Sequence, residues 1–361
     1  MTATTGQRAS RPGGGTARTP ADAGDLAGLL APLLEGAPQA TGTALCAVRA
    51  GERLLLCAGT TARDGGSPVD PDTRFEVGSV SKTYTALLLA DAVARGEVSY
   101  DDPVARYLPA GSVPVHRSGA PITLLHLATH TSGLPRLPRG FLATAVPVWS
   151  TTPYAGYPEQ RLLDSLGSTR VGSRPGSRVR YSNLGVGLLG QVLARAAGTD
   201  YPSLLDARVC RPLGLTGTGC SAAPGQATGH WHGRPRPPWQ IPALPGAGAV
   251  RSSARDLLRY LEALLEPDRA GALAPALAEV QRLRLVQPRS GEGLCLVWMQ
   301  RSRPGHELLF HTGGTRGFSA FVGYCPVTRT GLAALANTTP APGSGFLQDA
   351  YSRFRSLAEP G

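Results

Sequence analysis

A serine and a lysine stand three residues apart in the stretch FEVGSVSK, as Ser79 and Lys82. Apolar residues continue with helical spacing up to Gly96, so we predict a helix over 79–95. Positions i and i+3 share one helix face, and the hydroxyl and the amine can therefore meet. The positive end of the helix disfavours an ammonium group and stabilises an alkoxide. The pair predicts a nucleophilic serine beside a neutral amine.

Lys82 is the only lysine among the 36 basic residues of the chain. An arginine at this position would fail as a base, because a guanidinium group stays protonated in proteins. The net charge of +11 otherwise comes from scattered arginines, without a stretch that combines dense basic residues with aromatic ones. This distribution argues against nucleic-acid binding.

Tyr181 and Asn183 flank Ser182 just before a second predicted helix over 184–197. On an extended turn, residues two apart point to one side. The phenol can then relay a proton, and the carboxamide can bind an amide or ester substrate. The same three residues also fit a helix N-cap with an aromatic neighbour, and the residues alone leave both interpretations open.

The segment His311–Gly314 reads HTGG and ends a predicted strand. Its glycines let a substrate approach the backbone closely, and strand N–H groups there can stabilise an oxyanion. The segment equally fits a turn between strands with a surface histidine. Arg316 follows it, either as a ligand for a substrate carboxylate or as a solvated loop arginine.

The order and spacing of these three motifs are those of the active-site-serine enzymes that recognise penicillins. The chain resembles the class C β-lactamase and D,D-peptidase family, which includes serine esterases. Further matching segments cover 101–109, 124–134 (LLHLATHTSGL), 246–257 and 317–319. The resemblance extends over about residues 25–358.

Strand-like runs lie near both ends of the chain, with helical runs between them, which suggests one sheet built from the two termini. The resemblance likewise implies an α/β (α+β) fold: an antiparallel sheet from both chain ends flanked by helices, plus an inserted, mostly helical domain. We expect a disordered tail at 1–22, a sheet domain at 23–100 and 286–361, and a helical domain with substrate loops at 101–285. The expected strands are 43–48, 53–58, 294–300, 307–311, 318–324 and 331–336, and the other expected helices are 22–34, 201–209, 253–265, 272–285 and 345–358.

The resemblance implies a role for each motif residue. Ser79 attacks a carbonyl carbon and forms an acyl-enzyme, while Lys82 and Tyr181 share the general-base work. The N–H groups of Ser79 and Gly314 form the oxyanion hole, and His311 lines the cleft as a further catalytic residue. The implied substrate-binding residues are Asn183, Thr312, Gly313 and Arg316.

The expected function is that of a serine hydrolase acting on a small ester or amide, of the esterase or D-amino-acid/D,D-peptidase type. Histidine rather than lysine at position 311 argues against antibiotic hydrolysis. Two alternatives stay open: an acyltransferase or peptide-cyclising enzyme with the same acyl-enzyme, and a β-lactamase or a penicillin-binding sensor without turnover. We expect no cofactor and no metal, because His126 and His130 lack the His-Glu-x-x-His pattern of zinc hydrolases.

The 361 residues, 42% of them hydrophobic, suffice to bury one or two cores. Membrane insertion is not expected, because no apolar run approaches the roughly 20 residues of a spanning helix. The first residues lack the apolar middle of a secretory signal, so we expect a cytoplasmic protein. None of the six cysteines form a C-x-x-C pair, which favours buried free thiols. The oligomeric state is not readable from the sequence.

Overall fold

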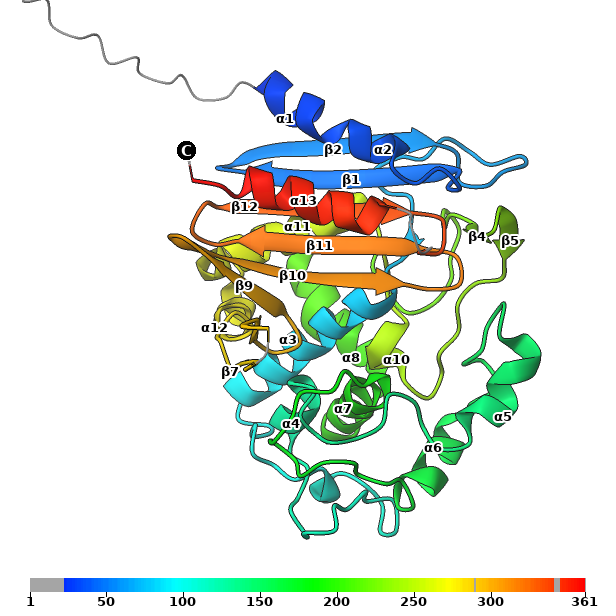
Figure 1. Ribbon diagram of the computed structural model, residues 1–361, viewed down its shortest axis with the longest axis vertical. Coiled ribbons are helices and arrows are strands. Elements are labelled where there is room, and N and C mark those ends of the chain that lie inside the picture. The colour runs from blue at the N-terminus through cyan, green and yellow to red at the C-terminus, as the bar shows by residue number, and fades with distance from the viewer. Residues whose placement is uncertain (1–22, 289, 341–344, 361) are drawn as a thin grey trace, which may run out of the picture.

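The computed structural model describes residues 23–288, 290–340 and 345–360. The tail predicted at 1–22 lies outside the described residues. Eight of the described strands form one antiparallel sheet in the order β2-β1-β12-β11-β10-β9-β8-β7. Strand β1, from the first part of the chain, pairs along its length with β12 from the last part (Figure 1). The sheet therefore joins both chain ends, as predicted.

The strands fall into this main sheet and two short pairs, β3 with β6 and β4 with β5. Their bounds are β1 Gly42–Arg49, β2 Glu52–Gly59, β3 Phe75–Glu76, β4 Gly229–Trp231, β5 Arg234–Arg236, β6 Arg251–Ser252, β7 Leu285–Val286, β8 Gly293–Leu294, β9 Met299–Arg303, β10 His306–Gly314, β11 Ser319–Cys325 and β12 Thr330–Ala336.

The helices lie mostly between β2 and β7 along the chain. Their bounds are α1 Ala23–Leu30, α2 Pro32–Glu35, α3 Ser81–Ala94, α4 Leu124–Ala128, α5 Phe141–Ala145, α6 Glu159–Leu166, α7 Asn183–Ala196, α8 Tyr201–Leu205, α9 Arg211–Leu213, α10 Pro245–Gly248, α11 Ala254–Leu265, α12 Ala274–Glu279 and α13 Phe346–Leu357.

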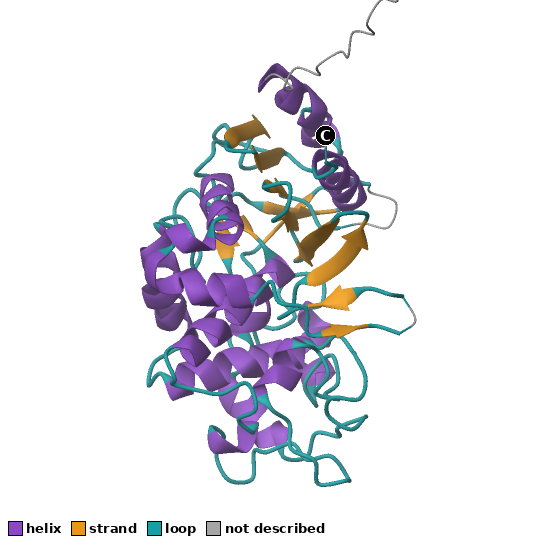
Figure 2. Cartoon of the chain, turned by 90° about the vertical axis from the view of Figure 1, so that its left-hand side faces the viewer, coloured by secondary structure: helices purple, strands orange, loops and turns teal. Residues whose placement is uncertain are grey.

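Both faces of the sheet are covered by helices. Successive residues of a strand point to opposite faces, so one strand contributes side chains to two apolar clusters. In β1, Leu45 and Ala47 pack into the apolar cluster formed with α1, α2 and α13. Their neighbours Cys46 and Val48 belong to the larger cluster on the other face, which contains α11 and the remaining helices. Figure 2 shows α1 and α13 on one side of the strands and most helices gathered on the other.

Helix α3 runs through the middle of the helical part and contacts α7, α10 and α12. Its residues from Ser81 to Ala92 are all buried, as in a helix surrounded by protein on every side. The predicted domain boundaries remain a prediction. Helix α11, which falls inside the range 101–285, packs against β1, β11 and β12 of the sheet.

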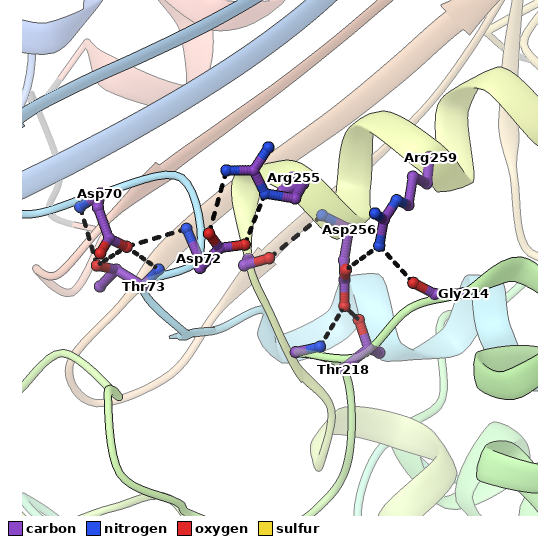
Figure 3. Close-up of polar contacts among 10 residues, drawn as sticks. Asp70, Asp72, Thr73, Gly214, Thr218, Arg255, Asp256 and Arg259 are labelled. Atoms are coloured by element: carbon purple, nitrogen blue, oxygen red, sulfur yellow. Dashed lines mark hydrogen bonds and ion pairs between the residues drawn. The ribbon is translucent and has the colours of Figure 1, made fainter.

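The first turn of α11 links segments that are distant in the sequence (Figure 3). Ser253 caps the helix by accepting a hydrogen bond from the Asp256 N–H at 3.2 Å. The Asp256 carboxylate accepts the Thr218 hydroxyl at 2.8 Å, and Arg255 pairs with Asp72 at 2.7 Å. Because Arg255 and Asp72 are exposed, their pair adds little stability, and the buried cap and carboxylate hold the helix start.

Some predicted elements differ from those observed. The predicted strand 294–300 is interrupted between β8 and β9, where Val297 has a φ of 55° and its N–H donates to Ala128 O at 2.9 Å. The predicted helix 272–285 is shorter, as α12 ends at Glu279. The predicted first helix is divided at Pro32, which begins α2 because proline fits the first turn of a helix.

All six cysteines are free thiols. Four of them are buried as predicted, whereas Cys57 and Cys220 are half-buried. Within the described ranges, no helix combines the length and apolar character needed to span a bilayer. The same part of the chain contains no group of three or more His, Cys, Asp or Glu side chains placed to hold a metal ion.

Candidate active site

Ser79 lies on a 3₁₀ turn, Gly78–Val80, that leads from β3 into α3. The α-helix begins at Ser81, two residues later than predicted, so the serine precedes the helix rather than starting it. Gly78 has a φ of 50°, and a Cβ there would lie 2.6 Å from the backbone nitrogen and oxygen of Gly314. The turn needs glycine because it bends sharply and is pressed against the end of β10.

Lys82 extends from the first turn of α3 back to the serine. Its Nζ donates to Ser79 Oγ at 2.9 Å and to the Ala247 carbonyl oxygen at 2.6 Å. The side chain is fully buried, and this burial lowers the pKa of the amine, although Tyr181 acts in the opposite direction. Burial therefore favours the neutral amine that a base requires.

Tyr181 approaches the serine from the other side. Its hydroxyl donates to Ser79 Oγ at 2.8 Å, and Lys82 Nζ lies 5.0 Å from the centre of its ring. Ser182 is the N-cap of α7 and accepts the Gly185 N–H at 2.8 Å. Of the two interpretations left open for this motif, the helix N-cap is confirmed. The structure also brings the Tyr181 hydroxyl to Ser79, and its role as a proton relay stays a prediction.

Asn183 is the first residue of α7. Its Nδ2 donates to the Tyr154 hydroxyl at 3.1 Å, and Tyr154 packs between Phe141 and Trp239 at ring distances of 4.5 and 5.5 Å. The buried Oδ1 of Asn183 has no hydrogen-bond partner within the described residues. A buried acceptor without a partner is costly, so this oxygen suits an N–H group supplied by a ligand.

The end of β10 completes the site. His311 is buried, and its Nδ1 donates to the Thr312 carbonyl oxygen at 2.8 Å. Burial, with a smaller effect of Lys82, lowers the pKa of His311 to about 3, so the imidazole is neutral at ordinary pH. A Cβ on Gly313 would lie only 2.0 Å from Val77 O and 3.0 Å from Ser79 N. The strand end and the serine turn are therefore in direct backbone contact.

Buried contacts of Glu76 connect the segment before the serine turn with β6 and with the end of β10. Glu76, three residues before Ser79, lies 3.5 Å from Arg251. Its carboxylate also accepts the Thr315 hydroxyl at 2.7 Å and the Trp239 N–H at 2.6 Å. Because Thr315 directly follows β10, Glu76 connects the strand before Ser79 with the segment after β10.

A cavity of about 600 Å³ opens over these groups. Lys82 and Asn183 are not part of its lining. The predicted site residues that line the cavity are Ser79, Tyr181, His311, Thr312, Gly313 and Gly314.

Arg316 lies apart from this lining. Its Nε donates to the Trp149 carbonyl oxygen at 2.8 Å. Its guanidinium group lies 5.0 Å from the ring centres of both Trp149 and Trp231. The side chain is thus neither a freely solvated arginine nor a wall of the cavity, and its contact with substrate stays a prediction. The roles given to the other site residues likewise remain predictions, now with a defined geometry.

His130 and Arg136 are among the cavity residues that were not predicted as site residues. His130 lies in the family-like segment 124–134, and the sequence analysis assigned it no role in the site beyond an unsupported zinc pair with His126. The structure separates these two histidines: His126 Nδ1 accepts the Thr123 N–H in a capping box, whereas the His130 ring packs against Tyr181. The signal that could have found His130 is its place in the segment 124–134, which matches the family but does not by itself show which of its residues reach the site.

Comparison with known proteins agrees with this arrangement. A family model described as Beta-lactamase matches residues 26–354. The chain is 30% identical over 319 residues to the D-alanyl-D-alanine-carboxypeptidase/endopeptidase AmpH of Escherichia coli (strain K12), covering 83% of this chain and 80% of that protein. It is 33% identical over 279 residues to the esterase EstB of Burkholderia gladioli, covering 67% and 69%.

The fold is similar to that of a class C β-lactamase mutant, with a TM-score of 0.78 and 22% identity, covering 92% of this chain and 96% of that one. This likeness confirms the predicted α/β fold of an antiparallel sheet flanked by helices. The family match spans nearly all the described residues and includes the three motifs around Ser79. The chain belongs to the Beta-lactamase family of serine hydrolases.

Proposed function

We propose that the protein hydrolyses a small ester or amide through an acyl-enzyme on Ser79. The observation that carries the proposal is the double contact on the nucleophile: the Lys82 amine at 2.9 Å and the Tyr181 hydroxyl at 2.8 Å both reach Ser79 Oγ. Either distance is short enough for direct proton transfer. A structural serine would not need a buried amine of lowered pKa beside it.

The steps follow from the contacts. As Ser79 Oγ bonds to the substrate carbonyl carbon, its proton passes to the Lys82 amine, either directly or through the Tyr181 hydroxyl, which gives up its own proton as it accepts the proton of the serine. The N–H groups of Ser79 and Gly314 donate hydrogen bonds to the oxyanion, and the leaving alkoxide or amine takes the proton. Water then attacks the acyl carbon, its proton passes back through the same groups, and Ser79 is released.

The substrate class is supported by two neutral groups among the predicted site residues. His311 lines the cavity as an uncharged imidazole, and the amide oxygen of Asn183 has no hydrogen-bond partner within the described residues. These groups suit an uncharged ester or amide bond at the acyl carbon, while Arg136 adds one positive charge to the cavity lining. The names of two relatives, a carboxypeptidase and an esterase, support the same choice. A cytoplasmic location remains a proposal from the sequence.

The nucleophile is tested by labelling with a fluorophosphonate probe. Wild-type protein should label on Ser79, and Ser79→Ala should not label. The matched control is Ser118→Ala, which changes a serine in an exposed loop and should label at the wild-type rate. Full labelling of the Ser79→Ala variant would refute the assignment.

The type of reaction is tested by incubating the protein with an activated ester and an amine acceptor, with intact mass spectrometry of the protein. Release of free acid supports hydrolysis. An amide product would instead support the acyltransferase alternative, and a persistent adduct the sensor alternative. Turnover of nitrocefin, compared with p-nitrophenyl esters and D-alanyl-D-alanine peptides, separates a β-lactamase from the proposed esterase or peptidase.

A further inference from the structure

His130 contacts Tyr181 and both of its sequence neighbours. The His130 carbonyl oxygen accepts the Arg180 N–H at 2.8 Å, and its ring Nδ1 accepts the Ser182 N–H at 3.3 Å. Between these two bonds, the His130 ring packs on the Tyr181 ring at a centre distance of 4.7 Å. One residue thus fixes the backbone before the tyrosine, the backbone after it and the face of its ring.

The backbone at His130 is adapted to this task. Its φ is 55°, a left-handed conformation that is unfavourable for residues other than glycine, asparagine and aspartate by about 1 kcal/mol. The conformation turns the carbonyl group and the ring toward the same neighbouring segment. Further bonds hold the two segments together, with the Thr131 carbonyl oxygen accepting the Gly176 N–H at 2.9 Å.

The protonation state of His130 suits the contact with Ser182. The ring is buried, and this burial, together with Lys82 and His311, lowers its pKa to about 3. A neutral imidazole keeps one nitrogen free to accept, and the Ser182 N–H occupies Nδ1, so the proton resides on Nε2. Within the described residues Nε2 has no partner, and the side chain lines the cavity.

We propose that His130 is a positioning residue of the active site, which holds the Tyr181 hydroxyl at its 2.8 Å contact with Ser79 Oγ. Arg136 lies 5.4 Å from the centre of the same phenol ring, so the ring is confined from more than one direction. The inference rests on the proposed acyl-enzyme function. It adds that Tyr181 takes part in the proton transfer from Ser79 only while His130 contacts it.

The test compares two substitutions that tolerate the left-handed backbone. His130→Gly removes the ring without backbone strain, and His130→Asn restores a side-chain acceptor near the position of Nδ1. We expect His130→Gly to lower the rate of Ser79 labelling, and kcat for p-nitrophenyl butyrate, by about 10- to 100-fold, as for a catalytic group misplaced by up to 1 Å. We expect His130→Asn to retain at least a third of the wild-type rate.

A double-mutant comparison shows whether His130 acts through the tyrosine. On a Tyr181→Phe background, His130→Gly should cost less than twofold, because the hydroxyl that it positions is already absent. An undiminished loss on that background would overturn the inference, as would full activity of His130→Gly or equal damage from Gly and Asn. Should the glycine variant not fold, His130→Ala takes its place on both backgrounds, and the same outcomes support or overturn the inference.

Two controls accompany the comparison. His232 is an exposed histidine with a φ of 50°, so His232→Gly repeats the same chemical change away from the cavity and should leave activity and melting temperature unaltered. Ser79→Ala tests the underlying function separately. If Ser79→Ala still labels, the proposed function fails. If it is inactive while His130→Gly is fully active, only the positioning role fails.

Discussion

Replacing Gly313 by alanine should separate the strand end from the nucleophile. The added Cβ would lie 2.0 Å from Val77 O and 3.0 Å from Ser79 N, and both are backbone atoms that cannot rotate away. Real Cβ contacts essentially never fall below 3.0 Å, so β10 and the serine turn must move apart by about 1 Å. A displacement of this size costs about 100-fold in rate, or about 2.7 kcal/mol of transition-state stabilisation.

The assay is steady-state hydrolysis of p-nitrophenyl butyrate, with the melting temperature measured in parallel. We expect the loss mainly in kcat, because the displaced N–H groups act on the oxyanion rather than on the bound ester. The matched control is Gly28→Ala in α1, where a Cβ meets nothing within 4 Å. A Gly313→Ala variant with normal kcat/KM and an unchanged melting temperature would refute the close approach of the two backbones.

Three further outcomes are expected. Lys82→Arg should lower kcat by at least about 100-fold, because the guanidinium cannot accept the serine proton; near-normal turnover would contradict the base role. Burial lowers the pKa of His130 and of His311 to about 3 in the folded protein, against about 6.5 when unfolded. The melting temperature should therefore be highest above pH 6.5 and should fall as the pH is lowered toward 3. His130→Asn should show a shallower fall over the same pH range. Glu76→Gln should lower the free energy of unfolding in urea by about 3 kcal/mol, because it leaves the buried Arg251 charge unpaired. An unchanged urea midpoint would show that the ion pair between Glu76 and Arg251 does not stabilise the fold.

Much of the site was predictable because its first pair is local. Ser79 and Lys82 are three residues apart, and a turn followed by a helix brings them together whatever the rest of the chain does. Tyr181 is 102 residues from Ser79, so its contact was inferred from the order of the motifs in a resembling family and not from any local pattern. The structure adds the distance between the Tyr181 hydroxyl and Ser79 Oγ, which the resemblance could not give.

What the sequence analysis missed depends on unusual backbone angles. Both His130 and Val297 have positive φ values, which no periodicity of apolar residues encodes. At Val297 this angle divides a run that looks like one continuous strand. At His130 it turns the side chain toward Tyr181, which residue type alone would not reveal. Arg316 shows a different gap, because its position between Trp149 and Trp231 depends on two loops that approach from distant parts of the chain.

The solitary lysine gives this enzyme an experimental advantage. Feeding cells with ¹⁵N- or ¹³C-enriched lysine would introduce the isotope at a single side chain, Lys82. Its NMR resonance would need no assignment and would report the ionisation of the amine directly as the pH is changed. Reagents that acylate amines would also find no other ε-amino group in the chain. The rate at which they modify Lys82 would therefore measure how often the buried amine becomes accessible to solvent.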